Sequence, residues 1–151
     1  MPSTISLAQN DVFQLNGTVI STFATGDCCK VTSPNNLIET DVGKNLGGLL
    51  AYNAKGLIAD AELDVIMGGI DDQNFNALLG EQMAQKLVPM TASLSKAFVD
   101  GHGNQIIVVY DLFGGGILKA PEEMVSATGN IAQLVAVWKF QFTNWDRNIA
   151  S

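Results

Sequence analysis

The densest group of ionisable residues in the chain is a set of three carboxylates two residues apart: Asp60, Glu62 and Asp64. On a β-strand, alternate residues project from the same face, so these side chains would form a row at intervals of roughly 6–7 Å. Carboxylates at about that spacing can act as nucleophile and acid in glycoside hydrolysis. Such an enzyme needs an aromatic-lined sugar cleft, and the only tryptophans available are Trp138 and Trp145. The sequence therefore favours a non-catalytic row, either a solvated strand face or the wall of a shared aqueous channel.

The other residue types that could do chemistry are too isolated in the sequence to form a site. His102 is the sole histidine and lies in a glycine-rich turn. Cys28 and Cys29 are adjacent, and because a disulfide between neighbouring residues closes a strained ring, we expect two thiols there. Neither pattern provides the ligand spacing of a metal site or the partners of a Ser-His-Asp triad. Since the glycines around Lys44 also lack the Gly-x-x-x-x-Gly-Lys-Ser/Thr spacing of a phosphate-binding loop, we expect no enzymatic activity, no metal and no cofactor.

The three carboxylates belong to residues 57–67, which alternate with period two and so predict a half-buried strand. The opposite face of this strand is apolar and comprises Ala59, Ala61, Leu63, Val65 and Met67. After two glycines the period changes, and apolar residues recur at helical spacing over residues 71–88. Asp71 and Asp72 suit the N-cap and first turn of that helix, and Pro89 ends it.

The predicted helix is amphipathic and needs an apolar surface to cover. Its apolar stripe contains Phe75, Leu78, Leu79, Met83 and Leu87. Aromatic residues at alternate positions near the C-terminus suit the facing surface of a sheet. We therefore predict a helix-on-sheet core formed by Phe75, Leu78, Leu79, Met83, Trp138, Phe140 and Phe142.

Most of the remaining chain is typical of strands, because it is rich in β-branched residues or alternates in hydrophobicity. The predicted strands cover residues 13–23, 28–32, 37–42, 91–99, 105–113 and 131–143. Three glycines from Gly114 break or bend the chain, residues 120–130 are expected to be a loop, and the tail from Asn144 is short and polar. The predicted fold class is mainly β: an antiparallel β-sandwich or partly closed β-barrel with one flanking amphipathic α-helix over about residues 71–88.

Residues 43–56 combine turn-forming glycines and asparagines with apolar side chains. In a lone monomer such a loop would be more polar, so we predict a long loop or hairpin whose apolar side is covered by another surface. Its candidate contact residues are Lys44, Leu46, Leu49, Leu50 and Tyr52. Residues 1–12 are predicted to form a polar N-terminal arm, and residues 13–151 a single domain.

Composition and charge limit the possible function classes. With 151 residues, nearly half of them apolar, the chain is long enough for one domain with its own core. Its net charge of −7 and its scattered lysines and arginines argue against a phosphate-binding face for nucleic acid. The N-terminus lacks the pattern of a signal peptide, and no apolar run reaches the roughly 20 residues that span a bilayer. We expect a soluble protein that folds in a reducing cytosol and does not bind membranes.

Four segments taken together resemble a known family of structural proteins. They are LNGTVISTFATGD, SPNNLIETDVGKN, YNAKGLIADAELDVIMGGIDDQNFNALL and AVWKFQF, in this order between about Phe13 and Arg147. The chain resembles the tail tube proteins that are encoded in contractile-tail modules of bacteriophages. Related folds occur in pyocin tubes and in the inner tube of type VI secretion.

The resemblance implies an antiparallel β-barrel or sandwich with a flanking helix, without catalysis or cofactor. It implies that six copies close a ring with one continuous inner barrel, and that rings stack through a long loop and the terminal segments. Asp60, Glu62 and Asp64 would then line an acidic lumen through which DNA passes without specific binding, and residues 43–56 would be the ring-stacking element. The expected partners are further copies of the chain, the tail sheath, and baseplate or terminator proteins. The expected location is a virion tail assembled in the cytoplasm of a host bacterium.

Two other interpretations remain open at this point. A carbohydrate- or peptide-binding β-sandwich of a phage baseplate or fibre needs a cleft lined by Trp, Tyr or Phe, whereas the aromatic residues here mostly occupy predicted core positions. A glycosidase that uses Glu62 is the third interpretation. The sequence pattern also shows no basic surface within one subunit that would pair with the three carboxylates.

Overall fold

The computed structural model describes residues 11–24, 28–42, 48–86, 89–122 and 134–150. The strands are β1 (Val12–Leu15), β2 (Thr18–Val19), β3 (Cys29–Thr32), β4 (Ile38–Val42), β5 (Gly48–Tyr52), β6 (Ala59–Ile66), β7 (Met90–Val99), β8 (Gln105–Lys119) and β9 (Val135–Ala150). A 3-10 helix, η1 (Ala54–Leu57), precedes β6, and an α-helix, α2 (Ile70–Met83), follows it. The described residues are therefore mainly β with one flanking α-helix, which confirms the predicted fold class.

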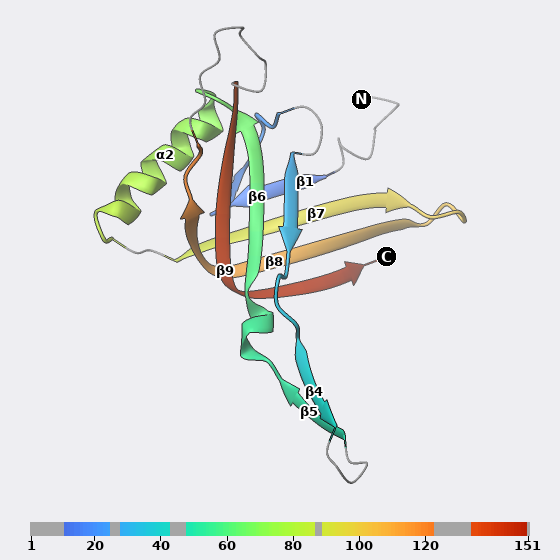
Figure 1. The fold of residues 1–151 in the computed structure, drawn as a ribbon. Coiled ribbons are helices and arrows are strands. Elements are labelled where there is room, and N and C mark those ends of the chain that lie inside the picture. The colour runs from blue at the N-terminus through green and yellow to red at the C-terminus, as the bar shows by residue number, and fades with distance from the viewer. Residues whose placement is uncertain (1–10, 25–27, 43–47, 87–88, 123–133, 151) are drawn as a thin grey trace, which may run out of the picture.

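Seven strands form one antiparallel sheet in the order β2-β1-β7-β8-β9-β6-β3. The long strands β8 and β9 bend, so each takes part in two layers (Figure 1). In one layer β7, β8 and the second half of β9 lie side by side, whereas in the other the first half of β9 pairs with β6 as far as Phe142. Figure 1 shows β6 running across the direction of β7 and β8. The sheet does not close on itself within the described residues, so the arrangement is a sandwich and not a barrel.

The bend is made by the glycine run of β8 and the facing residues of β9. Gly114 has a φ of +63°, which favours glycine, and its carbonyl oxygen accepts a hydrogen bond from Thr143 Oγ1 at 3.1 Å. Phe142 lies so close to Gly115 that a Cβ at Gly115 would overlap the phenylalanine ring. The glycines therefore bend the strand without ending it, and pairing with β9 continues through Ile117.

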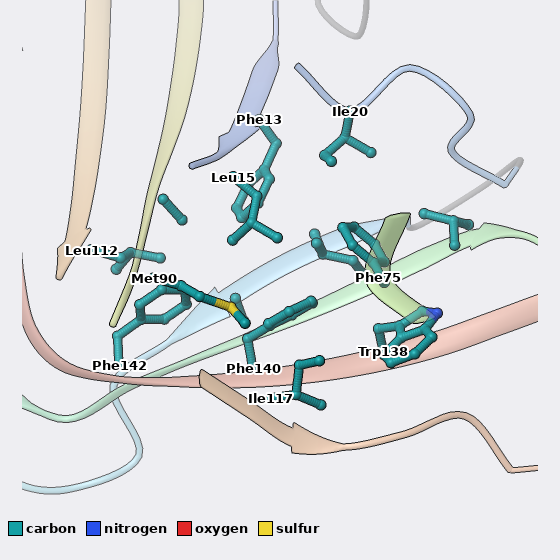
Figure 2. Close-up of a cluster of buried hydrophobic side chains, with 14 of the residues drawn as sticks. Phe13, Leu15, Ile20, Phe75, Met90, Leu112, Ile117, Trp138, Phe140 and Phe142 are labelled. Atoms are coloured by element: carbon teal, nitrogen blue, oxygen red, sulfur yellow. The ribbon is translucent and has the colours of Figure 1, made fainter. Parts of the chain in front are cut away.

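The hydrophobic core lies between the two layers and beneath α2 (Figure 2). The inward residues of β6 and β9 are buried, namely Ala59, Ala61, Leu63, Val65, Ala136, Trp138, Phe140 and Phe142. Phe75 of α2 enters this cluster edge-on, with its ring 5.6 Å from that of Trp138 and 5.2 Å from that of Phe140. Leu78 and Leu79 pack against the cluster and are partly exposed. The helix thus covers the sheet through its first three turns, mainly through Phe75, and it is not the strongly amphipathic helix that the sequence predicted.

The helix is shorter than the predicted residues 71–88, and its last turn is exposed. It ends at Met83, whose side chain is 74% exposed, so the prediction that Met83 belongs to the core is wrong. The chain turns at Gln85, which has a φ of +63°, and Leu87 lies outside the described residues. The last turn contacts the sheet through a polar residue instead. Gln82 donates from Nε2 to the carbonyl oxygen of Ile117 (2.8 Å) and accepts from its N–H (2.9 Å), as a neighbouring strand would.

Asp71 and Asp72 lie in the first turn of α2, whose N-cap is a glycine. Asp71 is buried, and its Oδ2 accepts hydrogen bonds from Ser21 N (3.0 Å), Thr22 N (2.7 Å) and Thr22 Oγ1 (2.5 Å). Asp72 accepts one from Trp138 Nε1 at 2.8 Å. Both carboxylates therefore fasten the helix to other elements, at the end where the helix dipole favours negative charge.

Residues 144–150, which were predicted to belong to a short polar tail, form the second half of β9. It pairs with β8 from Asn144 opposite Phe113 to Ala150 opposite Ile107. Trp145 packs against the core, whereas Asn144 and its other polar neighbours are exposed. The segment looks polar in sequence because only one of its faces is partly covered.

Strands β4 and β5 form a separate two-stranded antiparallel sheet that projects from the body (Figure 1). We call this element, residues 38–42 and 48–52, the hairpin arm. Residues 43–47, which include the candidates Lys44 and Leu46, lie outside the described residues. Within the predicted loop or hairpin of residues 43–56, residues 48–52 form β5 and residues 54–57 form η1. The hairpin itself pairs β5 with β4, which was predicted as a separate strand.

The variant Gly115→Ala tests the bend. The added Cβ would overlap the Phe142 ring, so we expect the free energy of unfolding to fall by about 1–3 kcal/mol. Gly101→Ala is the matched control, because a Cβ at Gly101 meets nothing within 4 Å, and it should change stability by less than about 0.5 kcal/mol. Urea denaturation measures both variants. Equal stability of the two would contradict the packing described at the bend.

Candidate functional site: assembly surfaces

The three carboxylates Asp60, Glu62 and Asp64, which we call the acidic row, lie on the outer face of β6, away from the core. They alternate with the buried Ala61 and Leu63, and each is half-buried. The row has β3 on one side and β9 on the other, so its surroundings are set by residues of three strands. The two-residue spacing therefore places the carboxylates on one face.

Basic residues flank the middle of the acidic row, contrary to the expectation that one subunit offers none. Lys30 of β3 and Lys139 of β9 both lie opposite Glu62 in the sheet register. Directly opposite residues share a face, with Cβ atoms roughly 4.5–5.5 Å apart. Asp60 also has a partner, since its Oδ1 accepts a hydrogen bond from Gln141 Nε2 at 3.0 Å. The face therefore carries mixed charge, which the sequence pattern hid because cross-strand neighbours are distant in the chain.

The depression beside the acidic row does not resemble a sugar-binding cleft. Its volume is about 160 Å³, and its lining residues are Lys30, Thr32, Asp60, Ala61, Glu62, Leu118 and Lys139, none of which is aromatic. Pockets that bind small organic ligands generally measure about 300–1,000 Å³. Trp138 is buried, and Trp145 donates its indole N–H to the carbonyl oxygen of Gly56 (2.9 Å), so both tryptophans are engaged elsewhere. The geometry does not support the glycosidase interpretation.

Asp64 is the member of the acidic row with an unsatisfied oxygen. Its Oδ1 is buried and has no hydrogen-bond partner in the described part of the chain. Burial, and secondly the neighbouring Glu62 carboxylate, raise the pKa of Asp64 above its ordinary value. A raised pKa in the folded state means that ionisation of the carboxyl group opposes folding. The contribution of Asp64 to stability is therefore most favourable at low pH, and it declines as the pH rises through the raised pKa.

The hairpin arm exposes large apolar side chains on both of its faces. Leu49, Leu50 and Tyr52 are 68%, 69% and 97% exposed. Ile38 lies opposite Tyr52 in the register, so Ile38, Leu50 and Tyr52 share one face and Leu49 lies on the other. An isolated two-stranded hairpin is marginally stable at best in water. Exposed apolar side chains gathered in this way are typical of an interaction surface.

Sequence reasoning missed Trp145, which holds the root of the arm. Its indole N–H donates to Gly56 of η1, the helix that joins the arm to β6. A tryptophan within an otherwise polar segment was the available signal, because a covered indole N–H usually finds an acceptor. Which acceptor it finds depends on the fold.

The remaining candidate residues do not form a chemical site. His102 lies in the turn between β7 and β8, where its backbone N–H donates to Asp100 Oδ1 at 2.8 Å. Burial, followed by the neighbouring Cys28, raises the pKa of the Cys29 thiol to about 12, so this thiol stays protonated and unreactive at neutral pH. The described residues contain no cluster of side chains that could hold a metal ion. No helix among them is long and apolar enough to cross a membrane.

Comparisons with solved structures identify relatives of this fold, although no family model and no curated protein matches the chain. The anti-feeding prophage cap, the AFP tube terminating cap, aligns with a TM-score of 0.65 and 8% identity over 99% of this chain and 95% of its own. The sheath/tube terminator of the PVC extracellular contractile injection system aligns with a TM-score of 0.59 and 7% identity over 99% of each chain. A chain of the PVC sheath-tube complex gives 0.59 and 7% over 98% of this chain and 99% of its own. The likeness shows the fold.

The variant Asp64→Asn should be more stable than the wild type at neutral pH, because the amide carries no charge to desolvate and is not repelled by Glu62. The advantage should shrink as the pH falls through the raised pKa and the wild-type carboxyl group becomes protonated. Thermal unfolding between about pH 4 and about pH 8 measures the difference. Asp60→Asn is the control, since Asp60 is hydrogen-bonded to Gln141 and should show no such gain. A wild type that is more stable than Asp64→Asn at neutral pH would refute this description.

Proposed function

We propose that this protein is the structural subunit of a contractile tail tube, which assembles as stacked rings of six subunits around a channel. The hairpin arm carries the proposal, because its exposed apolar side chains need a surface that the described part of one subunit does not provide. The fold, shared with components of contractile injection systems over nearly the whole chain, supports it. The number of six subunits follows the sequence resemblance to tail tube proteins. Such a protein acts through assembly and needs no catalysis or cofactor.

In this proposal the arm is the ring-stacking element. Burying an apolar side chain of this size contributes roughly 1.5–3 kcal/mol. Leu49, Leu50 and Tyr52 of every subunit would be buried together against the next ring. Because the contact is repeated around each ring, modest energies per subunit add up to a stable stack.

Open sheet edges support ring closure. The second half of β9 pairs with β8 on one side, whereas the pairing of β9 with β6 ends at Phe142. Strands β2 and β3 form the two ends of the sheet within the described residues. Unpaired edges favour pairing with another chain, and a closed ring of identical subunits would satisfy them.

We place the acidic row on the channel wall, where its charge would keep DNA phosphates from adhering. Lys30 and Lys139 weaken this effect, and Lys119 of β8 lies opposite Lys139 one strand further along. Three carboxylates and three lysines leave this face close to neutral. DNA would then pass because the wall carries no net positive charge, and the acidic row would serve mainly to balance the lysines.

A second candidate function is that of a protein that terminates the tube. The likeness to the tube terminating cap, with its TM-score of 0.65, favours this candidate. In either role the partners would be tail components, with the sheath around the tube and baseplate or terminator proteins at its ends. The location would be the tail of a virion or related particle assembled in a bacterial cytoplasm. A terminator would form single rings, whereas a tube subunit would form long stacks.

Replacing Leu49, Leu50 and Tyr52 together with serine should separate ring formation from stacking. The triple variant loses the apolar contact between rings but keeps the body of the subunit, so we expect single rings where the wild type gives tubes. Negative-stain microscopy and sedimentation velocity measure the assembly state. Met83→Ser is the matched control, because Met83 is 74% exposed but belongs to α2. Tubes of wild-type length from the triple variant would exclude the arm as the stacking element.

Replacing the acidic row with lysine should leave ring formation intact and make the channel retain DNA. The exchange reverses three charges in every subunit and adds to the lysines already on this face. Binding of short DNA to assembled tubes, measured at about 0.1 M salt, should rise strongly. Glu81→Lys on the exposed side of α2 is the control and should not cause retention. If the triple variant does not fold, the acidic row has a packing role and the channel interpretation is wrong.

A further inference from the structure

The root of the hairpin arm is a compact joint formed by η1 and residues 33–37. Asn53 precedes η1, and its Oδ1 accepts a hydrogen bond from Lys55 N at 3.2 Å. Asn53 N donates to the carbonyl oxygen of Leu37 (2.9 Å), and Asn35 Nδ2 donates to that of Lys55 (3.2 Å). The two strands of the arm are thus tied together before they enter the body.

Gly56 is the tightest point of this joint. It is buried, and a Cβ there would meet Asn36 O and Leu37 Cα at 2.7 Å. Its carbonyl oxygen accepts two hydrogen bonds, one from Ser33 Oγ at 3.0 Å and one from Trp145 Nε1 at 2.9 Å. A carbonyl oxygen has two lone pairs, so these two donors satisfy it completely.

Trp145 joins this carbonyl to the body of the subunit. It lies on β9 just beyond Phe142, where the pairing with β6 ends, and it is opposite Leu112 of β8. Its ring packs against the hydrophobic core. Trp145 is therefore carried by the strand with the open edge and contacts both the core and the root of the arm.

We propose that Trp145 is a positioning residue that sets the direction of the hairpin arm relative to the sheet. The inference rests on the proposed function, because it assigns the arm to stacking and the open edge of β9 to ring closure. Pairing of that edge with a neighbouring subunit would fix β9 and Trp145. Through Gly56, Trp145 would in turn fix the arm. Ring closure thus prepares the arm for stacking, and closed rings stack more readily than single subunits.

The variant Trp145→Phe tests the joint, because it removes the indole N–H and keeps an aromatic ring. Hydrogen exchange of the peptide covering residues 53–58, measured on the unassembled chain, reports opening of the joint. We expect exchange to be about three- to tenfold faster, the factor for loss of one ordinary hydrogen bond. Trp138→Phe is the matched control, because Trp138 also loses an indole hydrogen bond, to Asp72 of α2. It should leave exchange at the joint unchanged even if it lowers the melting temperature.

Unchanged exchange at the joint in Trp145→Phe would overturn the proposal, since Trp145 would then only fill the core. If this variant does not fold, nuclear magnetic resonance of the wild type replaces it. The indole N–H of Trp145 and the backbone N–H of Gly56 should then have matching protection factors, each relative to the intrinsic exchange rate of its own group, because they open together. A lower protection factor for the indole alone would overturn the proposal.

Assembly separates this inference from the proposed function. Wild-type tubes together with single rings of Trp145→Phe would support both. Tubes of equal length from the two chains would overturn the role of Trp145 and leave the proposed function intact. A wild type that forms neither rings nor tubes would contradict the proposed function, and hydrogen exchange would still decide whether Trp145 holds the joint.

Discussion

Phe142 packs across the backbone of Gly115, and this contact lets one seven-stranded sheet supply both layers of the sandwich. A side chain at position 115 would occupy the space of the ring, and the adjacent Gly114 adopts a positive φ. Because β8 and β9 bend together, the inward faces of the two layers meet, and α2 closes the core through Phe75. The direction in which β9 leaves the bend also determines where Trp145 meets the root of the hairpin arm.

The folded chain fixes its helix firmly on the sheet, whereas apolar side chains and strand edges at its periphery lack partners within the described residues. Asp71 accepts hydrogen bonds from the backbone of Ser21 and Thr22, which lie between β2 and β3, and Gln82 pairs with the backbone of Ile117 in β8. Both ends of α2 are therefore fixed. By contrast, Tyr52 stands 97% exposed on a two-stranded hairpin, and the second half of β9 has one unpaired edge within the described residues. Self-association would bury the exposed apolar side chains and would also pair the open strand edges.

Periodicity predicted the elements that bury one face against the core. The strand that carries the acidic row and the helix that follows it were predictable because alternation and helical spacing are local properties of the sequence. Sheet order is not local, so the position of Lys30 and Lys139 beside Glu62 was missed. Met83 extends the helical stripe in sequence, but the helix ends at this residue, which is exposed, and the neighbouring Gln82 makes the contact with the sheet. Trp145 lies among polar residues because only one face of this part of β9 is partly covered. The polar composition hid the fact that the strand continues beyond residue 143.

The central claim is that the apolar side chains of the hairpin arm are buried against the next ring. Cryo-electron microscopy of the unmodified chain, purified alone and concentrated, tests it most directly. We predict stacked rings with a central channel, in which residues 48–52 of each subunit are buried against the neighbouring ring. Particles that contain a single chain at high concentration, with the arm in solvent, would contradict it.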